Sequence, residues 1–146
     1  MYLPQIHPLQ VTTEITVQNI SDGITLQQEI RKKGEGAYSP LGQKPVKQTN
    51  VQTVFPVQEI CLWEPENPHL YEIRTSLWKN GEMIDARVDI TGFREAGFRK
   101  DGFYLNGKKL RLRGLNRHQS YPYVGYAAPA SMQIFDADIL KKELGV

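Results

Sequence analysis

Three consecutive polar residues close to the C-terminal end of the chain could do chemistry. Asn116, Arg117 and His118 follow a short stretch, 109–113, that we predict to be a β-strand. An imidazole can donate or accept a hydrogen bond, and side chains at the C-terminal end of a barrel strand face the mouth where barrel enzymes bind substrates. His118 is therefore a candidate functional residue. These residues by themselves leave a structural role for His118 equally open.

The acidic residues predict neither a catalytic carboxylate nor a metal site. Glu64, Glu66 and Glu95 occupy sandwich or linker positions. Asp136 and Asp138 alternate on a predicted helix, so their side chains point in different directions, which favours a solvated face over a cation site. The histidines also lack Cys, His or Asp partners at metal-ligand spacing. We therefore assign no catalytic residue and no metal ligand.

Composition limits the class of protein. The 146 residues carry a formal net charge of +2 with opposite charges mixed along the chain, so nucleic acid is not an expected partner. No apolar run approaches the roughly 20 residues of a membrane span, and no membrane association is expected. Cys61, the only cysteine, lies between Ile60 and Leu62 and is predicted to be a buried structural thiol. Cysteine use favours the cytoplasm, although the sequence leaves the localisation unknown.

The N-terminal half shows period-two alternation, which indicates β-strands with one buried face. Residues 11–19 and 24–31 alternate in this way across the turn residues 19–23, and we predict that they pair as antiparallel neighbours. Residues 32–47 are rich in Gly, Pro, Ser and Lys, which favours a mobile loop or a sheet edge. Alternation returns at 51–57, where Pro56 indicates an edge strand or a bulge.

A hairpin signal completes the first domain. Stretches 70–78 and 83–91 flank Asn80 and Gly81, whose types match the positive φ angles of a tight turn. Several strands separated by turns, with no helix before Ser131, are typical of an immunoglobulin-like β-sandwich. We assign this domain to residues 1–94 and the fold class to all-β.

The C-terminal part changes character. We predict strands at 97–99, 103–105 and 109–113, then a helix capped by Ser131. Its apolar residues are Ile134, Phe135, Ile139, Leu140 and Leu144. A strand followed by a helix suggests that the sandwich is followed by a β-hairpin and the first βα unit of a truncated (β/α)₈ barrel. This second domain comprises residues 95–146, far short of the about 250 residues that a whole barrel needs.

Four motifs resemble, in order and spacing, those of glycoside hydrolase family 2 β-galactosidases. They are Trp-Glu-Pro-Glu-Asn-Pro-His-Leu-Tyr at 63–71, Gly-Phe-Arg at 92–94, Asn-Gly-Lys at 106–108 and Asn-Arg-His at 116–118. The resemblance is most specific over 63–145. It places the first motif in a connecting sandwich domain, which favours packing over sugar stacking for Trp63. It also implies that His118 contacts the galactosyl unit of a substrate, while Asn116 and Arg117 are supporting candidates that shape the site.

The resemblance further implies a retaining hydrolase of terminal β-galactosides, to which this chain contributes a fragment. Retaining enzymes need two carboxyl groups about 5 Å apart. The family's acid/base lies in an Asn-Glu pair that is missing from this sequence, and its nucleophile lies farther downstream, so the fragment is expected to be inactive. No cofactor is expected in the fragment, whereas the intact enzyme is expected to use Mg and Na by family resemblance.

The remaining expectations concern the substrate, a rival function and self-association. Gln119-Ser120-Tyr121 departs from the acidic residue and histidine common in the family after Asn-Arg-His, which leaves β-glucuronides and β-mannosides open beside β-galactosides. The rival function is a non-catalytic adhesion or carbohydrate-binding module, which a sandwich alone would suit. The incomplete barrel segment predicts self-association of the fragment, because its strand and helix lack neighbours.

Overall fold

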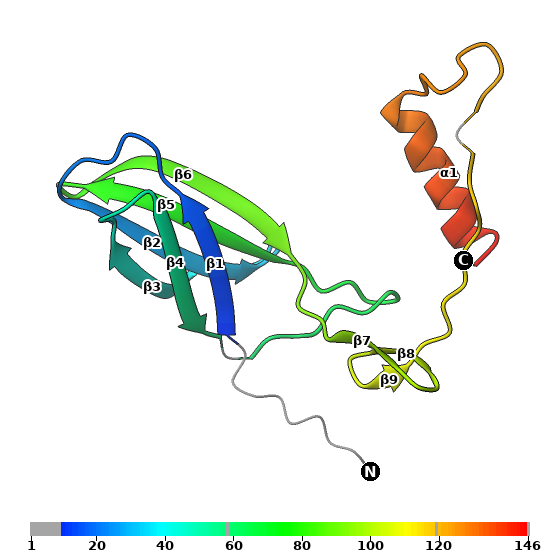
Figure 1. The fold of residues 1–146 in the computed structure, drawn as a ribbon, viewed down its shortest axis with the longest axis horizontal. Helices are drawn as coiled ribbons and strands as arrows, with labels where there is room; N and C mark the ends of the chain where they lie inside the picture. Colours follow the sequence, from blue (N-terminus) through cyan, green and yellow to red (C-terminus); the bar gives the residue numbers. More distant parts are fainter. Residues whose placement is uncertain (1–9, 58, 119, 146) are drawn as a thin grey trace.

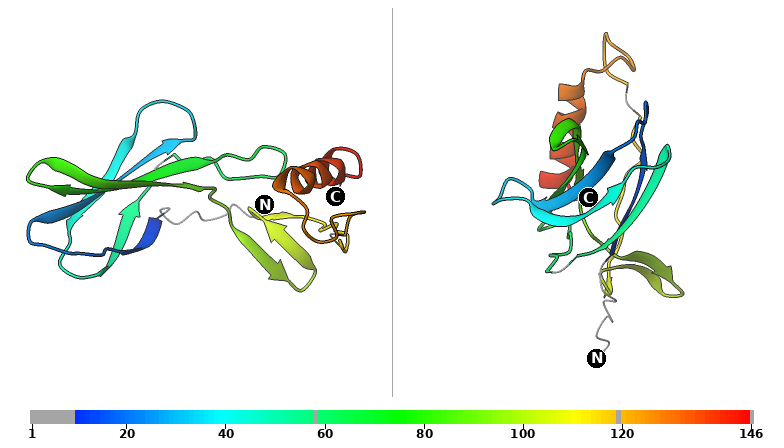
Figure 2. Two further views of the ribbon diagram at one scale, coloured as in Figure 1. Left: turned by 90° about the horizontal axis from the view of Figure 1, so that it is seen from above. Right: turned by 90° about the vertical axis from the view of Figure 1, so that its left-hand side faces the viewer.

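The computed structural model describes residues 10–57, 59–118 and 120–145. Within these ranges the chain forms a β-sandwich with a smaller three-stranded sheet and a helix beyond one end (Figures 1 and 2). The elements are β1 Gln10–Thr16, β2 Ile24–Lys32, β3 Ser39–Pro45, β4 Asn50–Pro56, β5 Tyr71–Lys79, β6 Glu82–Thr91, β7 Ala96–Arg99, β8 Gly102–Leu105, β9 Lys108–Lys109 and α1 Ala130–Lys142. The first nine residues of the predicted domain 1–94 lie outside the described residues.

The sandwich consists of two antiparallel sheets of unequal width. β1 pairs with β4, and the larger sheet has the order β3-β2-β5-β6. Every second residue of β2 from Ile24 to Ile30 is buried, because successive side chains of a strand point to opposite faces. The buried side chains of the two sheets meet in two apolar clusters, one around Leu26 and Val51 and the other around Val11 and Ile73. This burial confirms a β-sandwich.

A single amide side chain sits in the middle of this core. Gln28 is 1% exposed and bridges the two sheets. Its Oε1 accepts a hydrogen bond from Thr53 Oγ1 at 2.6 Å, and its Nε2 donates to Thr13 Oγ1 at 3.1 Å and to Thr75 Oγ1 at 3.0 Å. A buried polar group is costly unless it is hydrogen-bonded. The three threonine hydroxyls meet that need, and they fix β1, β2, β4 and β5 in one register.

The outer face of the larger sheet carries a ring of charges around one tyrosine. The Tyr38 ring lies between the guanidinium groups of Arg31 and Arg74, 4.4 and 4.3 Å from its centroid. Tyr38 donates its hydroxyl proton to Glu72 at 2.8 Å, and Arg31 Nε donates to the same carboxylate at 2.7 Å. The hydrogen bond from Tyr38 has the larger effect in lowering the pKa of Glu72, and the hydrogen bond from Arg31 lowers it further. The arrangement fastens residues 33–38, which precede β3, onto the sheet.

Several predicted elements of the sandwich are confirmed. β5 and β6 form the expected hairpin, and its turn residues Asn80 and Gly81 have φ angles of 53° and 82°. β4 pairs with β1 but with no other strand among the described residues, so Pro56 stands on an edge strand as predicted. The stretch 32–47 contains the edge strand β3, which agrees with the sheet-edge alternative.

The predicted pairing of the first two strands is wrong. β1 belongs to the small sheet with β4, whereas β2 pairs with β3 and β5 in the larger sheet. The residues between them, including Asn19 at φ 55° and Gly23 at φ 82°, carry the chain from one sheet to the other. Alternation shows that each strand has one buried face, but face-to-face packing across a core and edge-to-edge pairing produce the same pattern.

The C-terminal segment differs from prediction in two places. β7, β8 and β9 form a three-stranded antiparallel sheet, but residues 110–118 are not strand, so the predicted strand 109–113 is wrong beyond Lys109. Beyond β9, the backbone N–H of Leu110 still donates a hydrogen bond to Phe103 O in β8, at 2.9 Å. The helix forms, but its N-cap is Pro129 and not Ser131, and no residue of α1 is buried. Among the described residues, no neighbouring strand pairs with residues 110–113.

The predicted burial of Cys61 is also wrong. Cys61 is exposed, in the connection between β4 and β5, and its backbone N–H donates to the Tyr71 hydroxyl at 2.8 Å. The apolar neighbours that suggested burial are only half-buried, because this connection runs over the sandwich surface. No helix in the described part of the chain is long and apolar enough to cross a membrane.

Candidate functional site

The motifs at 63–71 and 92–94 meet at the end of the sandwich. Trp63 N donates to Phe93 O at 2.8 Å, and a Cβ added to Gly92 would lie 2.9 Å from the Trp63 ring. Phe93 packs edge-on against Tyr71 with ring centroids 5.4 Å apart, and the Arg94 guanidinium lies 5.4 Å from the Trp63 ring. A glycine at 92 is what allows the indole to approach the backbone. The packing role predicted for Trp63 is confirmed.

Asn106 connects this junction to the three-stranded sheet. It stands in the turn between β8 and β9 at φ 51°, followed by Gly107 at φ 76°. Its side-chain Nδ2 donates to Trp63 O at 2.9 Å, and its Oδ1 accepts from Glu95 N at 3.0 Å. A lysine next in sequence, Lys108, forms an ion pair with Glu64 at 3.0 Å. The motif Asn-Gly-Lys at 106–108 thus holds the small sheet against the connection that contains Trp63.

The Asn-Arg-His motif lies in the extended segment between β9 and α1. Asn116 and His118 are exposed, whereas Arg117 is half-buried. Arg117 points toward α1, where its Nε donates to Asp136 Oδ2 at 2.9 Å and its NH1 donates to Gln133 Oε1 at 2.8 Å. The structure therefore anchors the middle residue of the motif and leaves the two flanking side chains accessible.

A tyrosine completes the cluster around Arg117. The guanidinium NH2 donates to the Tyr121 hydroxyl at 2.8 Å, and that hydroxyl donates to the Asp136 carboxylate. The hydrogen bond from Tyr121, followed by that from Arg117, lowers the pKa of Asp136, while the pKa of Arg117 is raised. The charged forms of both partners are stabilised, so the segment that carries His118 is fastened to α1 by a charge-assisted contact.

Sequence reasoning missed part of this cluster. The prediction of a solvated face for Asp136 is wrong, because Arg117 and Tyr121 engage that carboxylate. Gln133 and Asp136 are three positions apart on α1, the spacing that puts two side chains on one helix face, and this signal could have indicated a shared partner. Asp138 behaves as predicted for a solvated position, since it pairs with Lys142 at 2.9 Å on an exposed face.

The other acidic residues do not approach the motif. Glu64 pairs with Lys108, and Glu95 is exposed beside the small sheet. In residues 10–57, 59–118 and 120–145, no three His, Cys, Asp or Glu side chains come together in a way that could hold a metal ion. The arrangement presents one accessible imidazole on an anchored segment.

Comparison with known proteins identifies the family. The sequence profile of the glycosyl hydrolases family 2 matches residues 5–94, more than half of the chain. The chain belongs to this family. Within it, the family-2 chain is 54% identical to the β-galactosidase of Thermoanaerobacterium thermosulfurigenes over 101 residues, which are 69% of this chain and 14% of that enzyme. It is 40% identical to the β-galactosidase of Thermoanaerobacter pseudethanolicus over 139 residues, which are 94% of this chain and 19% of that enzyme.

The fold of the family-2 chain also resembles that of a solved structure. A crystal structure of a putative β-galactosidase from Bacteroides fragilis superposes with a TM-score of 0.73 at 24% identity, covering 90% of this chain and 21% of that one. The chain thus spans about a fifth or less of the curated relatives named above. An alignment of 139 residues necessarily extends past Arg94, so the resemblance includes the segment that contains His118.

Proposed function

We propose that this chain forms part of a retaining glycoside hydrolase that hydrolyses terminal β-galactosides. The two sequence relatives named above are both β-galactosidases, and one of them matches 94% of the chain. In this proposal residues 1–94 are an immunoglobulin-like sandwich and residues 95–146 are the start of the (β/α)₈ catalytic barrel. The observation that carries the proposal is the Asn-Arg-His motif at 116–118, which lies within the region shared with the second of these relatives.

In the intact enzyme His118 is the substrate-binding residue that this chain supplies. Its side chain is exposed, so a sugar hydroxyl can reach the imidazole, and the neighbouring Arg117 is held by Asp136, Gln133 and Tyr121. Fixing the backbone next to a binding group lowers the entropy lost when substrate binds. Arg117 therefore acts as a positioning residue, and Asn116 shapes the site beside it.

The two catalytic carboxylates come from outside this chain in our proposal. Retention requires an acid/base and a nucleophile about 5 Å apart. Asp136, the carboxylate that contacts the motif, binds Arg117, and Glu64, away from the motif, binds Lys108. We accordingly propose that the isolated chain has no glycosidase activity. For the intact enzyme we also propose Mg²⁺ and Na⁺, on the family resemblance alone, and no catalytic step in this chain depends on them.

The exposed apolar side chains of the tail support one further proposal about partners. Leu112, Leu115, Ile134 and Phe135 are 59 to 65% exposed. Exposed apolar surface of this kind is normally covered in a stable protein. We propose that the isolated chain self-associates through residues 95–146 at high concentration.

The test of the function is His118→Ala in the intact enzyme. Loss of one charged or strongly polar hydrogen bond in the transition state should lower kcat/KM on a nitrophenyl β-galactoside by about 10- to 150-fold, equivalent to about 1.5–3 kcal/mol. The matched control is His69→Ala, because His69 bonds to Asn67 in the connection of the sandwich and should leave kcat/KM within about twofold. Equal kinetics for both variants would reduce His118 to a structural residue.

A further inference from the structure

The last strand of the larger sheet has one free edge. Among the described residues β6 pairs only with β5, and residues 82–90 are all exposed (Figure 1). Its register with β5 shifts beside Ile84, which is left as an extra residue, and 85–91 continue beyond it as a regular stretch. This stretch contains neither proline nor lysine, the residues that commonly protect a sheet edge. Its backbone N–H and C=O groups on the side away from β5 are therefore open to a strand of another chain.

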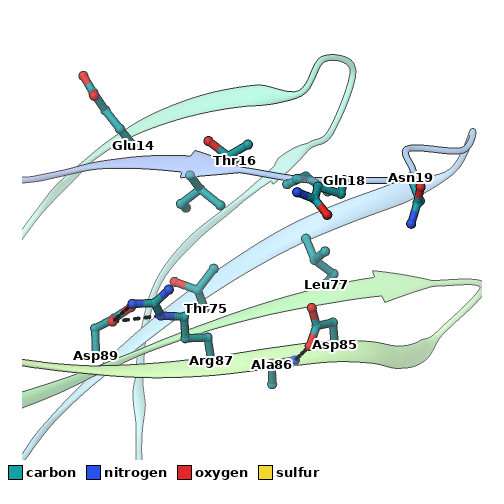
Figure 3. A pocket seen from close by; sticks show the side chains of 12 residues that line it. Glu14, Thr16, Gln18, Asn19, Thr75, Leu77, Asp85, Ala86, Arg87 and Asp89 are labelled. Carbon is teal, nitrogen blue, oxygen red and sulfur yellow. Dashed lines mark hydrogen bonds and ion pairs between the residues drawn. The ribbon is translucent and has the colours of Figure 1, made fainter.

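The two faces of the regular stretch differ in chemistry. Its register with β5 places Ala86, Val88 and Ile90 on the outer face of the sheet, where Val88 and Ile90 are 49 and 56% exposed. The inner face carries three charged side chains in a row, and Figure 3 shows them beside the space between β6 and β1: Asp85, Arg87 and Asp89. A strand that matches both faces must present apolar residues on one side and charges of alternate sign on the other. β6 itself meets this description.

Symmetry limits how β6 can pair with a second copy of itself. Two identical strands related by a two-fold axis perpendicular to the sheet run antiparallel. Residues opposite one another in such a pair carry their side chains on the same face of the sheet. Because successive residues alternate between the faces, the axis must pass through a residue and not between two residues. The register is thus defined by the residue on the axis.

The charges select Val88 as that residue. With Val88 on the axis, Arg87 lies opposite Asp89 of the second copy, and the same pair recurs on the other side of the axis. Each copy already pairs Arg87 with Asp89 at 2.8 Å, so the four side chains form a square in which every charge has opposite charges as neighbours. Opposite charges that face each other across two strands stabilise the pairing. On the outer face Val88 meets itself, and Ile90 meets Ala86 of the second copy.

The neighbouring registers lose this complementarity. An axis one residue to either side of Val88 places Arg87 or Asp89 against itself, and like charges directly opposite one another are destabilising. An axis at Ala86 pairs Val88 with Ile84, at the point where the strand is irregular. Registers centred farther along pair fewer residues. Val88 is also the middle of the regular stretch, so its register uses the whole of that stretch, about 24 Å of strand.

We propose that β6 is a self-complementary edge through which two copies of this chain form a two-fold dimer centred on Val88. The two larger sheets then join into one continuous sheet, in which β6 of each copy is a central strand. This contact is separate from the self-association proposed for residues 95–146, and it does not rest on glycosidase activity. An unrelated extended peptide is a poorer occupant, because it would have to reproduce both the apolar row and the alternating charges.

The experiment follows the full chain over a concentration series. Sedimentation velocity gives the dissociation constant of the dimer, and hydrogen exchange with mass spectrometry locates the contact. We expect protection of 85–91 to rise with concentration, whatever occurs in 95–146. Protection of 85–91 that is already complete in the dilute monomer would overturn the proposal, because the edge is then covered within one chain. Concentration-dependent protection confined to 95–146 would also overturn it, because association then involves the tail alone.

A matched pair of variants tests the position of the axis. Val88→Lys places two ammonium groups opposite one another in the dimer and should raise the dissociation constant about tenfold or more. Val54→Lys makes the same change on β4, an edge strand of the other sheet, at a valine that is 51% exposed. This control should leave the dissociation constant within about twofold of the original. Equal effects of the two substitutions would refute an axis at Val88.

Exchange of the two charges tests the register. Arg87→Asp alone places acidic groups opposite one another and should weaken the dimer about tenfold. The double variant Arg87→Asp with Asp89→Arg restores opposite charges with their signs exchanged, so its dissociation constant should return to within about threefold of the original. Circular dichroism of each variant checks that the sandwich is intact. The proposal fails if the folded double variant is as weak as the single one, or if the unaltered chain shows no dimer at millimolar concentration.

Discussion

Gln28 is the residue on which the sandwich depends most specifically. Its amide is buried between the sheets and bonded to three threonine hydroxyls, one each from β1, β4 and β5. An apolar side chain at this position would pack, but it would leave those hydroxyls to one another. The amide therefore selects a single register of the four strands as well as stabilising it, since a shift by one residue would remove it from the core.

We predict that Gln28→Ala lowers the free energy of unfolding by about 2–4 kcal/mol, because it leaves a cavity and removes hydrogen bonds from buried hydroxyls. The neighbouring Gln27 is half-buried on the outer face, and Gln27→Ala should cost less than about 1 kcal/mol. Urea titration followed by circular dichroism compares the two variants. Equal losses would show that the buried network contributes nothing beyond the outer-face residue.

Asp136 leads to a prediction about pH. Hydrogen bonds from Tyr121 and Arg117 depress its pKa, so its contribution to the docking of α1 is present above the pKa of the unfolded chain. That contribution is lost as the pH falls below about 4 and passes through the lower pKa of the folded state. The carboxyl ¹³C shift of Asp136 should titrate below the ordinary aspartate range.

The matched variants are Tyr121→Phe and Tyr126→Phe. The first removes the hydroxyl that donates to Asp136 and should move its titration midpoint upward, whereas Tyr126 is 76% exposed and its loss should leave the midpoint in place. If the midpoint of Asp136 stays unchanged in Tyr121→Phe, the hydrogen bond is not the cause of the shift.

Among the elements, the β5–β6 hairpin has the most local cause. Asn80 and Gly81 both take positive φ angles, which a two-residue turn of this hand requires and which glycine adopts without strain. The turn also sets the register that aligns the polar side of β6 with the inner side of β5.

We predict that Gly81→Ala lowers the free energy of unfolding by about 1–2 kcal/mol, because φ is 82° there and a side chain is strained at that angle. The control is Gly97→Ala in β7, where an added Cβ meets no atom within 4 Å and φ is not positive. That variant should be neutral or slightly stabilising. Thermal unfolding of both proteins would refute the argument if the Gly81 variant were the more stable.

Local chemistry explains which elements could be predicted. The sequence predicts the turn at Asn80 and Gly81 and the edge character of β4, because each depends on a few adjacent residues. The pairing of β1 with β4 spans more than thirty residues of chain, and neither strand contains a feature that names its partner. The strand at 109–113 failed for the converse reason, since its extension depends on neighbouring strands and not on its own residues.

The candidate site likewise contains residues that the sequence predicts and contacts that it does not. Asn116, Arg117 and His118 were found because they are consecutive and match a known motif. The cluster of Arg117 with Tyr121 and Asp136 was not found, because contacts between a loop and a helix follow from the path of the backbone. His118 as the substrate-binding residue stays a prediction.

For the molecule as a whole, the sandwich and the tail should differ in stability. The sandwich buries two apolar clusters, whereas α1 buries no residue and the apolar side chains of Ile134 and Phe135 are 64 and 65% exposed. Short helices without a packing partner are marginal in water. Local opening should therefore be easier after Arg94 than within the sheets.

We predict that hydrogen exchange of a dilute monomer is fastest in α1 and in 110–118 and slowest in β2 and β5. Mass spectrometry of peptic fragments would measure it, with sedimentation velocity to verify the monomer. Raising the concentration should protect the tail if it self-associates as proposed. Protection of α1 equal to that of β2 in the monomer would show that the tail folds by itself and that the division at Arg94 is wrong.

The contact of Trp63 with Gly92 has a spectroscopic consequence. The chain contains two tryptophans, Trp63 at the junction and Trp78 on the outer face of the sheet, where its indole N–H donates to Ser76 at 2.9 Å. The Arg94 guanidinium lies 5.4 Å from the first indole, and Asn106 of the small sheet bonds to the backbone carbonyl of the same residue, so the emission of Trp63 depends on whether the small sheet is docked. In a variant in which Trp78 is replaced, Trp63 is the single fluorophore and reports on the junction between the sandwich and the small sheet. A red shift of its emission without loss of the β-sheet signal in circular dichroism then marks undocking of the small sheet before the sandwich unfolds.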